Sequence, residues 1–150
     1  MTDCFDCLPG MYCSQQGLKA PDGLCDMGYF CTKKSTTPNP TDGITGNACL
    51  AGGFCDMGSF ESVSCKPGTF NPNTLATSEA DCIACTPGKY CSGTFISVET
   101  GDCTAGYYCE AGSTIPTAIA ADKGYYSGVG ASKQIPCAVG MYNPLPAQSS

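Results

Sequence analysis

One short pattern recurs eight times along this chain of 150 residues, and it constrains the fold more than any other feature. Nearly every copy begins with cysteine, every copy has glycine at its fourth position and an aromatic residue at its sixth, and most end on a second cysteine. The copies are CLPGMYC at 7, CDMGYFC at 25, CLAGGFC at 49, CKPGTFN at 65, CTPGKYC at 85, CTAGYYC at 103, ADKGYYS at 121 and CAVGMYN at 137. Their starts lie 16 to 24 residues apart, which predicts a tandem repeat with a period near 18.

The glycine and aromatic columns persist even where the cysteines do not. In the seventh copy Ala121 and Ser127 replace both cysteines, yet Gly124 and Tyr126 remain. Glycine at a fixed place predicts a positive φ or a close backbone approach at a turn. The aromatic side chain is the one large apolar group that each copy offers, so we expect it to be buried.

A repeat of this length cannot bury a core alone, so neighbouring copies must share their surfaces. The predicted fold is therefore small and disulfide-rich, mostly irregular with short β-strands or hairpins, and extended as a tandem-repeat rod. One helical turn is expected within NTLATSEADC, residues 73–82. Repeats one to three occupy 1–64, repeats four and five 65–102, and repeats six to eight 103–150, with the array expected to continue beyond both ends.

Fourteen cysteines in 150 residues are typical of chains stapled by disulfides in an oxidising compartment. We therefore predict an extracellular location, at a cell or flagellar surface. The net charge of -6 argues against a nucleic-acid partner, because phosphate binding depends on clustered basic residues. No run of 18 apolar residues occurs, so no direct membrane insertion is predicted from this segment.

The regular spacing suggests that each copy is bridged to the next, through cysteines 18 residues apart. This predicts four pairs: Cys7 with Cys25, Cys13 with Cys31, Cys85 with Cys103, and Cys91 with Cys109. For Cys49, Cys55, Cys65 and Cys82 three connectivities remain, and we favour Cys65 with Cys82 and Cys49 with Cys55. Cys4 and Cys137 are expected to bond cysteines upstream and downstream of this segment.

The stretch CKPGTFNPNTLATSEADCIACTPGKYC, residues 65–91, joins two copies through a loop and a C-x-x-C pair. It resembles the ephrin-receptor-like cysteine-rich repeat, which is related to EGF-like and growth-factor-receptor-like modules. The resemblance extends in diluted form over residues 4–143. What it implies is architecture, namely spacers, stalks and assembly surfaces, and the family has no catalytic residues to transfer.

The residue types present argue against catalysis and against a metal or cofactor site. The chain has no histidine, so a serine or cysteine nucleophile lacks its usual base, and we expect no enzyme and no cofactor. The two C-x-x-C pairs lie far apart in the sequence and fit disulfides better than zinc. Asp22 and Asp42 precede glycines and read as turns, because no loop has the alternating acidic ligands of a calcium site.

The fifth position of the copies varies and is often large and apolar. Adjacent residues of an extended segment point to opposite faces, so a buried sixth position predicts an exposed fifth. The resulting candidate assembly contacts are Met11, Tyr29, Tyr107, Tyr125 and Met141. The alternative, that loops from neighbouring repeats fold over these side chains, stays open.

Two segments are rich in threonine, serine and proline: KKSTTPNPT at 33–41 and GSTIPT at 112–117. They are candidates for O-linked glycans, although plain solvated turns explain each site equally well. The predicted function is a structural shaft that contacts other protomers of a filament, fibril, flagellar hair or cell coat. The alternative is the stalk or ligand-binding ectodomain of a receptor or adhesion protein, with its binding patch in the insertion at 32–48.

Overall fold

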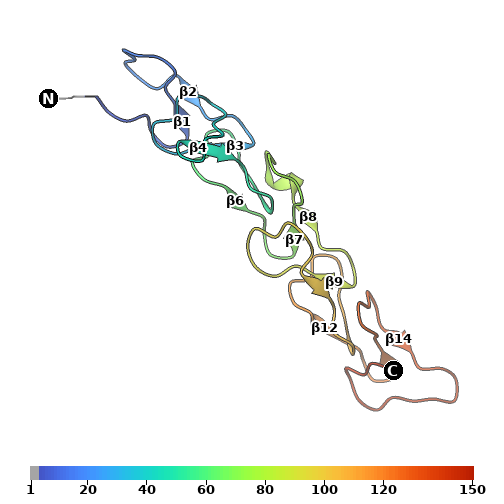
Figure 1. Ribbon diagram of the computed structural model, residues 1–150. Helices are drawn as coiled ribbons and strands as arrows, with labels where there is room; N and C mark the ends of the chain where they lie inside the picture. Colours follow the sequence, from blue (N-terminus) through green and yellow to red (C-terminus); the bar gives the residue numbers. More distant parts are fainter. Residues whose placement is uncertain (1–3) are drawn as a thin grey trace. The chain divides into compact units, whose positions relative to one another are not determined.

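A computed structural model describes residues 4–150 of the chain. Its regular structure consists of very short strands that pair as antiparallel hairpins (Figure 1). The strands are β1 (Met11–Tyr12), β2 (Gly23–Leu24), β3 (Tyr29–Cys31), β4 (Gly46–Ala48), β5 (Gly53–Phe54), β6 (Val63–Ser64), β7 (Thr69–Phe70), β8 (Ile83–Ala84), β9 (Lys89–Tyr90), β10 (Gly101–Asp102), β11 (Tyr107–Tyr108), β12 (Ile119–Ala120), β13 (Tyr125–Tyr126) and β14 (Ile135–Pro136). The predicted class, a small disulfide-rich fold with short hairpins, is confirmed.

Each hairpin joins one copy of the repeat to the chain entering the next. The fifth and sixth residues of a copy form one strand, and the two residues before the following copy form the other. Met11 thus pairs with Leu24 in β1 and β2, and Tyr107 pairs with Ala120 in β11 and β12. The same register recurs in the first seven copies, and β3 with β4 adds a third pair of residues.

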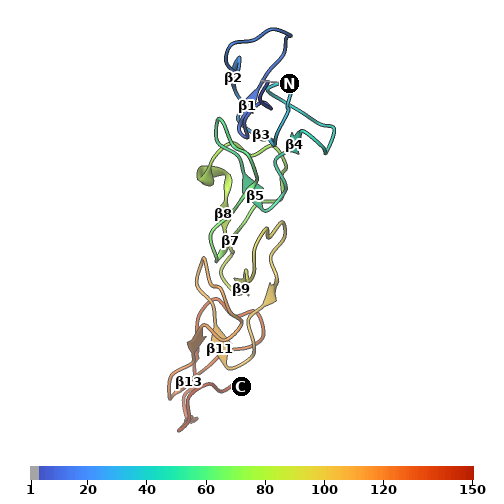
Figure 2. The ribbon, with the colours of Figure 1, turned by 90° about the vertical axis from the view of Figure 1, so that its left-hand side faces the viewer.

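The one 3-10 turn among residues 4–150, η1 (Glu79–Asp81), lies in the loop after the fourth copy, where a helical turn is expected (Figure 2). The Asp81 carboxylate accepts hydrogen bonds from the backbone N–H groups of Thr77 at 2.8 Å and Ser78 at 3.1 Å. These hydrogen bonds lower the pKa of Asp81, and the one from the Thr77 N–H contributes most. The prediction of a helical turn within 73–82 is confirmed.

The chain divides into two compact units. One unit comprises Met1–Cys65 and Asn71–Cys82, and the other comprises Lys66–Phe70 and Ile83–Ser150. The division falls within the fourth copy, whose turn belongs to the second unit while its long loop belongs to the first.

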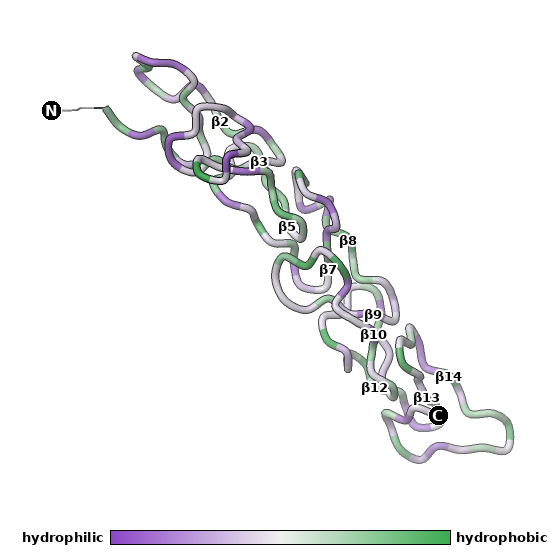
Figure 3. The backbone as a smooth tube through the Cα atoms, viewed as in Figure 1, coloured by the Kyte–Doolittle hydropathy of each residue, from purple (hydrophilic) through white to green (hydrophobic). Residues whose placement is uncertain are grey.

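The interior of the copies is made of cysteine rather than of aromatic side chains. Eight cysteines are essentially inaccessible to solvent: Cys25, Cys31, Cys49, Cys55, Cys85, Cys91, Cys103 and Cys109. The sixth-position aromatics are half-buried in the first seven copies, and Tyr142 in the eighth is 85% exposed. Apolar residues accordingly lie scattered along the tube, without a long apolar segment (Figure 3).

The expectation that the aromatic column forms the core is therefore wrong. The space at the centre of a copy is occupied by its two sulfur atoms, and the ring lies across the hairpin instead. A Cβ added at Gly23 would be 3.3 Å from Cε1 of Tyr12, and one at Gly101 would be 3.3 Å from Cε1 of Tyr90. The rings of Tyr12 and Tyr90 thus cover the strand that leads into the next copy.

Within residues 4–150, no helix has the length and apolar composition needed to cross a membrane.

Candidate functional site

The feature that the structure repeats is a disulfide closed within one copy. Five of the six bridges join the first and seventh positions of the same copy, with Cα atoms 5.8 to 6.1 Å apart. They are Cys7 with Cys13, Cys25 with Cys31, Cys49 with Cys55, Cys85 with Cys91, and Cys103 with Cys109. The sixth bridge joins Cys65 to Cys82.

The four predicted bridges between successive copies are wrong. They were Cys7 with Cys25, Cys13 with Cys31, Cys85 with Cys103, and Cys91 with Cys109. The reason is a tight turn at positions two to five, where the fifth-position N–H donates to the second-position carbonyl, as in Met11 to Leu8 at 3.1 Å and Tyr107 to Thr104 at 3.0 Å. This turn reverses the chain and brings the seventh residue back to the first, within bridging distance. The two favoured pairs, Cys65 with Cys82 and Cys49 with Cys55, are the ones the structure has.

The glycine column is explained by the same turn. All eight fourth-position glycines have a positive φ, for example 78° at Gly10 and 89° at Gly106. A turn with a positive φ at its third residue favours glycine there and accepts proline just before it, as at Pro9 and Pro87. The predicted positive φ is confirmed throughout the column.

In the first seven copies the fourth-position glycine also bonds the next copy through both of its backbone polar groups. The N–H of Gly88 donates to the carbonyl of Cys109 at 2.8 Å, and its carbonyl accepts from the N–H of Cys103 at 2.9 Å. Gly106 makes the same two bonds to the seventh copy, with Ser127 at 2.7 Å and Ala121 at 2.9 Å. Successive copies are therefore joined by backbone bonds that do not depend on the side chain at either cysteine position.

A second left-handed column lies in the tail of each copy, three or four residues after the seventh position. Its members with a positive φ are Gly17, Lys34, Gly58, Leu75, Phe95, Gly112, Gly130 and Ala147. The N–H of Gly130 donates to the Cys103 carbonyl at 2.9 Å, and the N–H of Ala147 donates to the Ala121 carbonyl at 2.8 Å. Sequence reasoning missed this column, although the recurring glycine three residues after the seventh position in copies three, six and seven was a usable signal.

The two columns meet between copies that are not neighbours in sequence. A Cβ added to Gly88 would clash with the carbonyl oxygen of Gly130, and one added to Gly106 would clash with that of Ala147. Gly124 has nothing within 4 Å of that position. The glycines Gly10, Gly28, Gly68, Gly88 and Gly106 are thus required for close approach as well as for their φ.

Asparagine replaces the second cysteine in the fourth and eighth copies. The Nδ2 of Asn71 donates to the Gly53 carbonyl at 3.2 Å, and the Nδ2 of Asn143 donates to the Tyr125 carbonyl at 2.7 Å. The asparagine amide thereby hydrogen-bonds its copy to the preceding one. The cysteine at the first position of the copy is left without its usual partner and can bond another cysteine. In the fourth copy that partner is Cys82.

Cys4 and Cys137 have no disulfide partner among the residues the structure describes. Cys4 is exposed and Cys137 is half-buried. Their expected bonds to cysteines outside the segment stay predictions.

In the seventh copy Ala121 and Ser127 occupy the buried places that two cysteines take elsewhere, and both are fully inaccessible. The Ser127 hydroxyl has no hydrogen-bond partner among the described residues. This copy keeps the fold of a bridged copy and leaves one polar atom unsatisfied, which costs about 1 to 3 kcal/mol by general experience.

The candidate assembly contacts at the fifth position do not behave alike. Met11, Tyr29 and Tyr107 are half-buried, so the expectation that they are exposed is wrong for these three. A strand of two residues in an isolated hairpin has no core face, so the fifth and sixth side chains are shielded to a similar degree. Tyr125 is 37% exposed and Met141 is 73% exposed.

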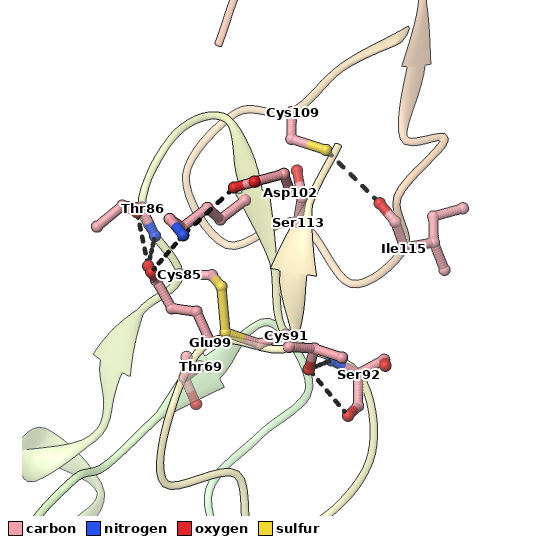
Figure 4. The surroundings of a disulfide bond; sticks show 12 residues. Thr69, Cys85, Thr86, Cys91, Ser92, Glu99, Asp102, Cys109, Ser113 and Ile115 are labelled. Atoms are coloured by element: carbon pink, nitrogen blue, oxygen red, sulfur yellow. Dashed lines mark hydrogen bonds and ion pairs between the residues drawn. A yellow bond between two sulfur atoms is a disulfide. The ribbon is translucent and has the colours of Figure 1, made fainter. Parts of the chain in front are cut away.

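Carboxylates in the segments between copies accept pairs of hydrogen bonds from single serine or threonine residues. Glu99, before the sixth copy, accepts hydrogen bonds from the N–H of Thr86 at 2.8 Å and its hydroxyl at 2.6 Å (Figure 4). These hydrogen bonds lower the pKa of Glu99, and the one from the Thr86 hydroxyl contributes most. The positive charge of Lys89 lowers this pKa by a smaller amount. Asp22 binds the N–H and hydroxyl of Ser14 in the same way, which lowers its pKa.

Within residues 4–150, no group of three or more potential ligand side chains is placed to hold a metal ion. The Asp42 carboxylate accepts the N–H groups of Ile44 at 2.8 Å and Thr45 at 2.7 Å, which closes a local turn.

No protein-family model matches this chain. It is 35% identical over 91 residues to ABC transporter G family member 28 of Arabidopsis thaliana, a match that covers 61% of this chain and 7% of the transporter. It is 32% identical over 122 residues to ABC transporter G family member 25 of Oryza sativa subsp. japonica, covering 75% of this chain and 10% of the transporter. The chain thus spans no more than a tenth of the length of the curated relatives it matches.

Proposed function

We propose that this chain is an extracellular structural segment, a disulfide-stapled shaft within a surface or filamentous assembly. The observation that carries the proposal is the repeated frame in which a fourth-position glycine bonds the next copy and abuts the tail of the copy after that. A frame of this kind transmits order from copy to copy without a large apolar core, which suits a spacer.

The disulfides support the proposed location. Six bridges in a small module fit a secreted or extracellular protein, because reducing compartments keep thiols unpaired. The resemblance to ephrin-receptor-like repeats supports the same role, since such modules act as spacers and stalks.

The comparisons favour a second candidate, the stalk of a larger cell-surface protein. Both curated relatives are named as transporters, and the matched stretch is a small part of each. In this alternative the segment spaces or presents another domain and does not associate with itself.

The proposed self-association would use the fifth-position side chains that are exposed, Tyr125 and Met141. Large apolar side chains left in water commonly mark an interaction surface. The partner we propose is another protomer of the same assembly.

The test is sedimentation velocity with electron microscopy on the oxidised chain over a wide concentration range. We expect concentration-dependent oligomers or filaments, which a variant carrying Y125S and M141S loses. The matched control is M27S, which removes an exposed methionine outside the fifth-position column. A monodisperse monomer at the highest concentration would overturn the assembly and favour the stalk.

A further inference from the structure

The tails of the second and sixth copies share the sequence Ser-Thr-x-Pro at the same distance from the seventh-position cysteine. One stretch is 35–38, which begins four residues after Cys31, and the other is 113–116, which begins four residues after Cys109. Each stretch directly follows the residue of its tail that has a positive φ, Lys34 in the second copy and Gly112 in the sixth. The two stretches lie in different structural units, so they are independent instances of one arrangement.

In the second copy the backbone holds this stretch at both ends. The Ser35 carbonyl accepts the N–H of Cys13 from the preceding copy at 2.8 Å, and the Pro38 carbonyl accepts the N–H of Asp26 at 2.8 Å. Thr36 lies between these two fixed points and is exposed.

The sixth copy repeats the arrangement. The Ser113 carbonyl accepts the N–H of Cys91 at 2.9 Å, and the Pro116 carbonyl accepts the N–H of Thr104 at 2.8 Å. Thr114 is exposed between them. In Figure 4 the Ile115 carbonyl is directed toward the Cys109 sulfur, and the oxygen and sulfur atoms are 3.6 Å apart. This part of the tail therefore lies against the disulfide.

The hydroxyl groups of the two stretches fall into two sets. Those of the serines are used internally, Ser35 donating to the Thr37 carbonyl at 2.9 Å and Ser113 donating to the Glu110 carbonyl at 2.8 Å. By contrast, Thr36 and Thr114 are exposed, and their hydroxyls have no hydrogen bond to any residue that the structure describes. Each Ser-Thr-x-Pro stretch therefore presents one free hydroxyl between two backbone hydrogen bonds, and its other hydroxyls, that of Thr37 included, are occupied.

We infer that Thr36 and Thr114 are acceptor sites for O-linked sugars. The inference rests on the proposed extracellular function, because the sugar is added in the secretory route. Exposed threonine close to proline in extracellular stalks is the setting in which such sugars occur. A bulky, hydrated sugar at these positions would be carried on the outside of the turn, away from the buried bridge.

The transfer uses a nucleotide-sugar donor and an external transferase. A bond forms between Thr Oγ1 and the anomeric carbon of the sugar, and the bond from that carbon to the nucleotide phosphate breaks. The hydroxyl proton passes to a base of the transferase, and a nucleoside diphosphate leaves with the bonding electron pair. No oxidation or reduction occurs.

The experiment is mass spectrometry of the full chain secreted from eukaryotic cells, with fragmentation that locates each modification and a parallel count of free thiols. We expect sugar on both threonines, the loss of one site in T36V or T114V, and the loss of both in the double variant. The matched controls T41V and T117V change exposed threonines of the same loops outside the shared stretch, and they should leave the sugar in place.

Several outcomes would overturn the inference. Bare threonines, phosphate at these positions, or sugar confined to Ser35, Ser113, Thr41 or Thr117, with the disulfides intact, would overturn these sites alone. Unpaired thiols throughout the protein would overturn the extracellular function and the glycan sites together.

Discussion

The sixth and seventh copies differ at both bridge positions and yet have the same backbone. The sixth copy has the Cys103 to Cys109 disulfide, whereas the seventh has Ala121 and Ser127 in equivalent buried places. The N–H groups of Cys109 and Ser127 each donate to a carbonyl in the tail of the following copy, Ala131 at 3.0 Å and Gln148 at 2.9 Å. The difference teaches that the glycine turn and the copy-to-copy bonds set the shape, while the bridge acts mainly by restricting the unfolded chain.

The largest expected change in stability distinguishes two reasons for glycine at the fourth position, its positive φ and the close approach of another backbone. G106A should destabilise the protein by about 3 kcal/mol or more, because it adds a clash with the Ala147 carbonyl to the cost of a positive φ. G124A has only the φ cost, about 1 to 2 kcal/mol, since its surroundings are open. Urea unfolding of both variants measures the difference, and equal losses would remove close approach from the explanation.

The next test gives the sixth copy the two residues that the seventh copy has at its bridge positions. The double variant C103A with C109S should lose about 2 kcal/mol, the chain-entropy value for so short a loop. Hydrogen exchange should still show protection of the Gly88 and Gly106 amides, because their bonds do not involve sulfur. Loss of that protection would show that the bridge shapes the copy.

The reverse change should have a similar magnitude and the opposite sign. A121C with S127C, made in a background of C4S and C137S, should close a seventh bridge and raise the free energy of unfolding by at least about 2 kcal/mol. The change also removes the unpartnered Ser127 hydroxyl. Thermal unfolding with and without reductant measures the gain, and a pair that stays reduced under oxidising conditions would contradict the proposed equivalence of the two copies.

These comparisons show which parts of the structure the sequence could predict. Gly124 and Tyr126, which persist without cysteines, identified the repeat, and glycine alone implied the positive φ. The sequence could not choose between bridges within a copy and bridges to the next copy, because a regular repeat keeps both separations constant, six residues in the one case and 18 in the other. The tail column also escaped prediction, since Lys34, Leu75 and Ala147 adopt a left-handed conformation that their residue types do not announce.

A smaller effect is expected in that tail column. A147G should stabilise the protein by about 0.5 kcal/mol, because relief of the left-handed strain exceeds the extra entropy of glycine in the unfolded chain. G130A, at the matching place one copy earlier, should instead cost about 1 kcal/mol. Chemical unfolding of the pair tests both signs, and a loss of stability in A147G would contradict the strain.

The smallest expected effect is on pH dependence. The pKa values of Asp22 and Glu99 are lowered in the folded chain, so the stability they contribute is present above their unfolded values and is lost as pH falls through the folded ones. As the pH falls through the lowered pKa of Glu99, the Thr86 amide should exchange severalfold faster after correction for its intrinsic rate. E99Q should abolish this acid dependence, and an unchanged pH profile in that variant would assign the effect to another group.

The shared bonding of the fourth-position glycines has a consequence for inheritance. Because successive copies offer the same donors and acceptors to their neighbours, a whole copy gained or lost by recombination leaves the remaining junctions complete. The stretches between copies vary in length already, whereas the seven residues from first to seventh position do not. Such a chain can therefore lengthen or shorten over generations in steps of one copy, while its smallest unit stays fixed.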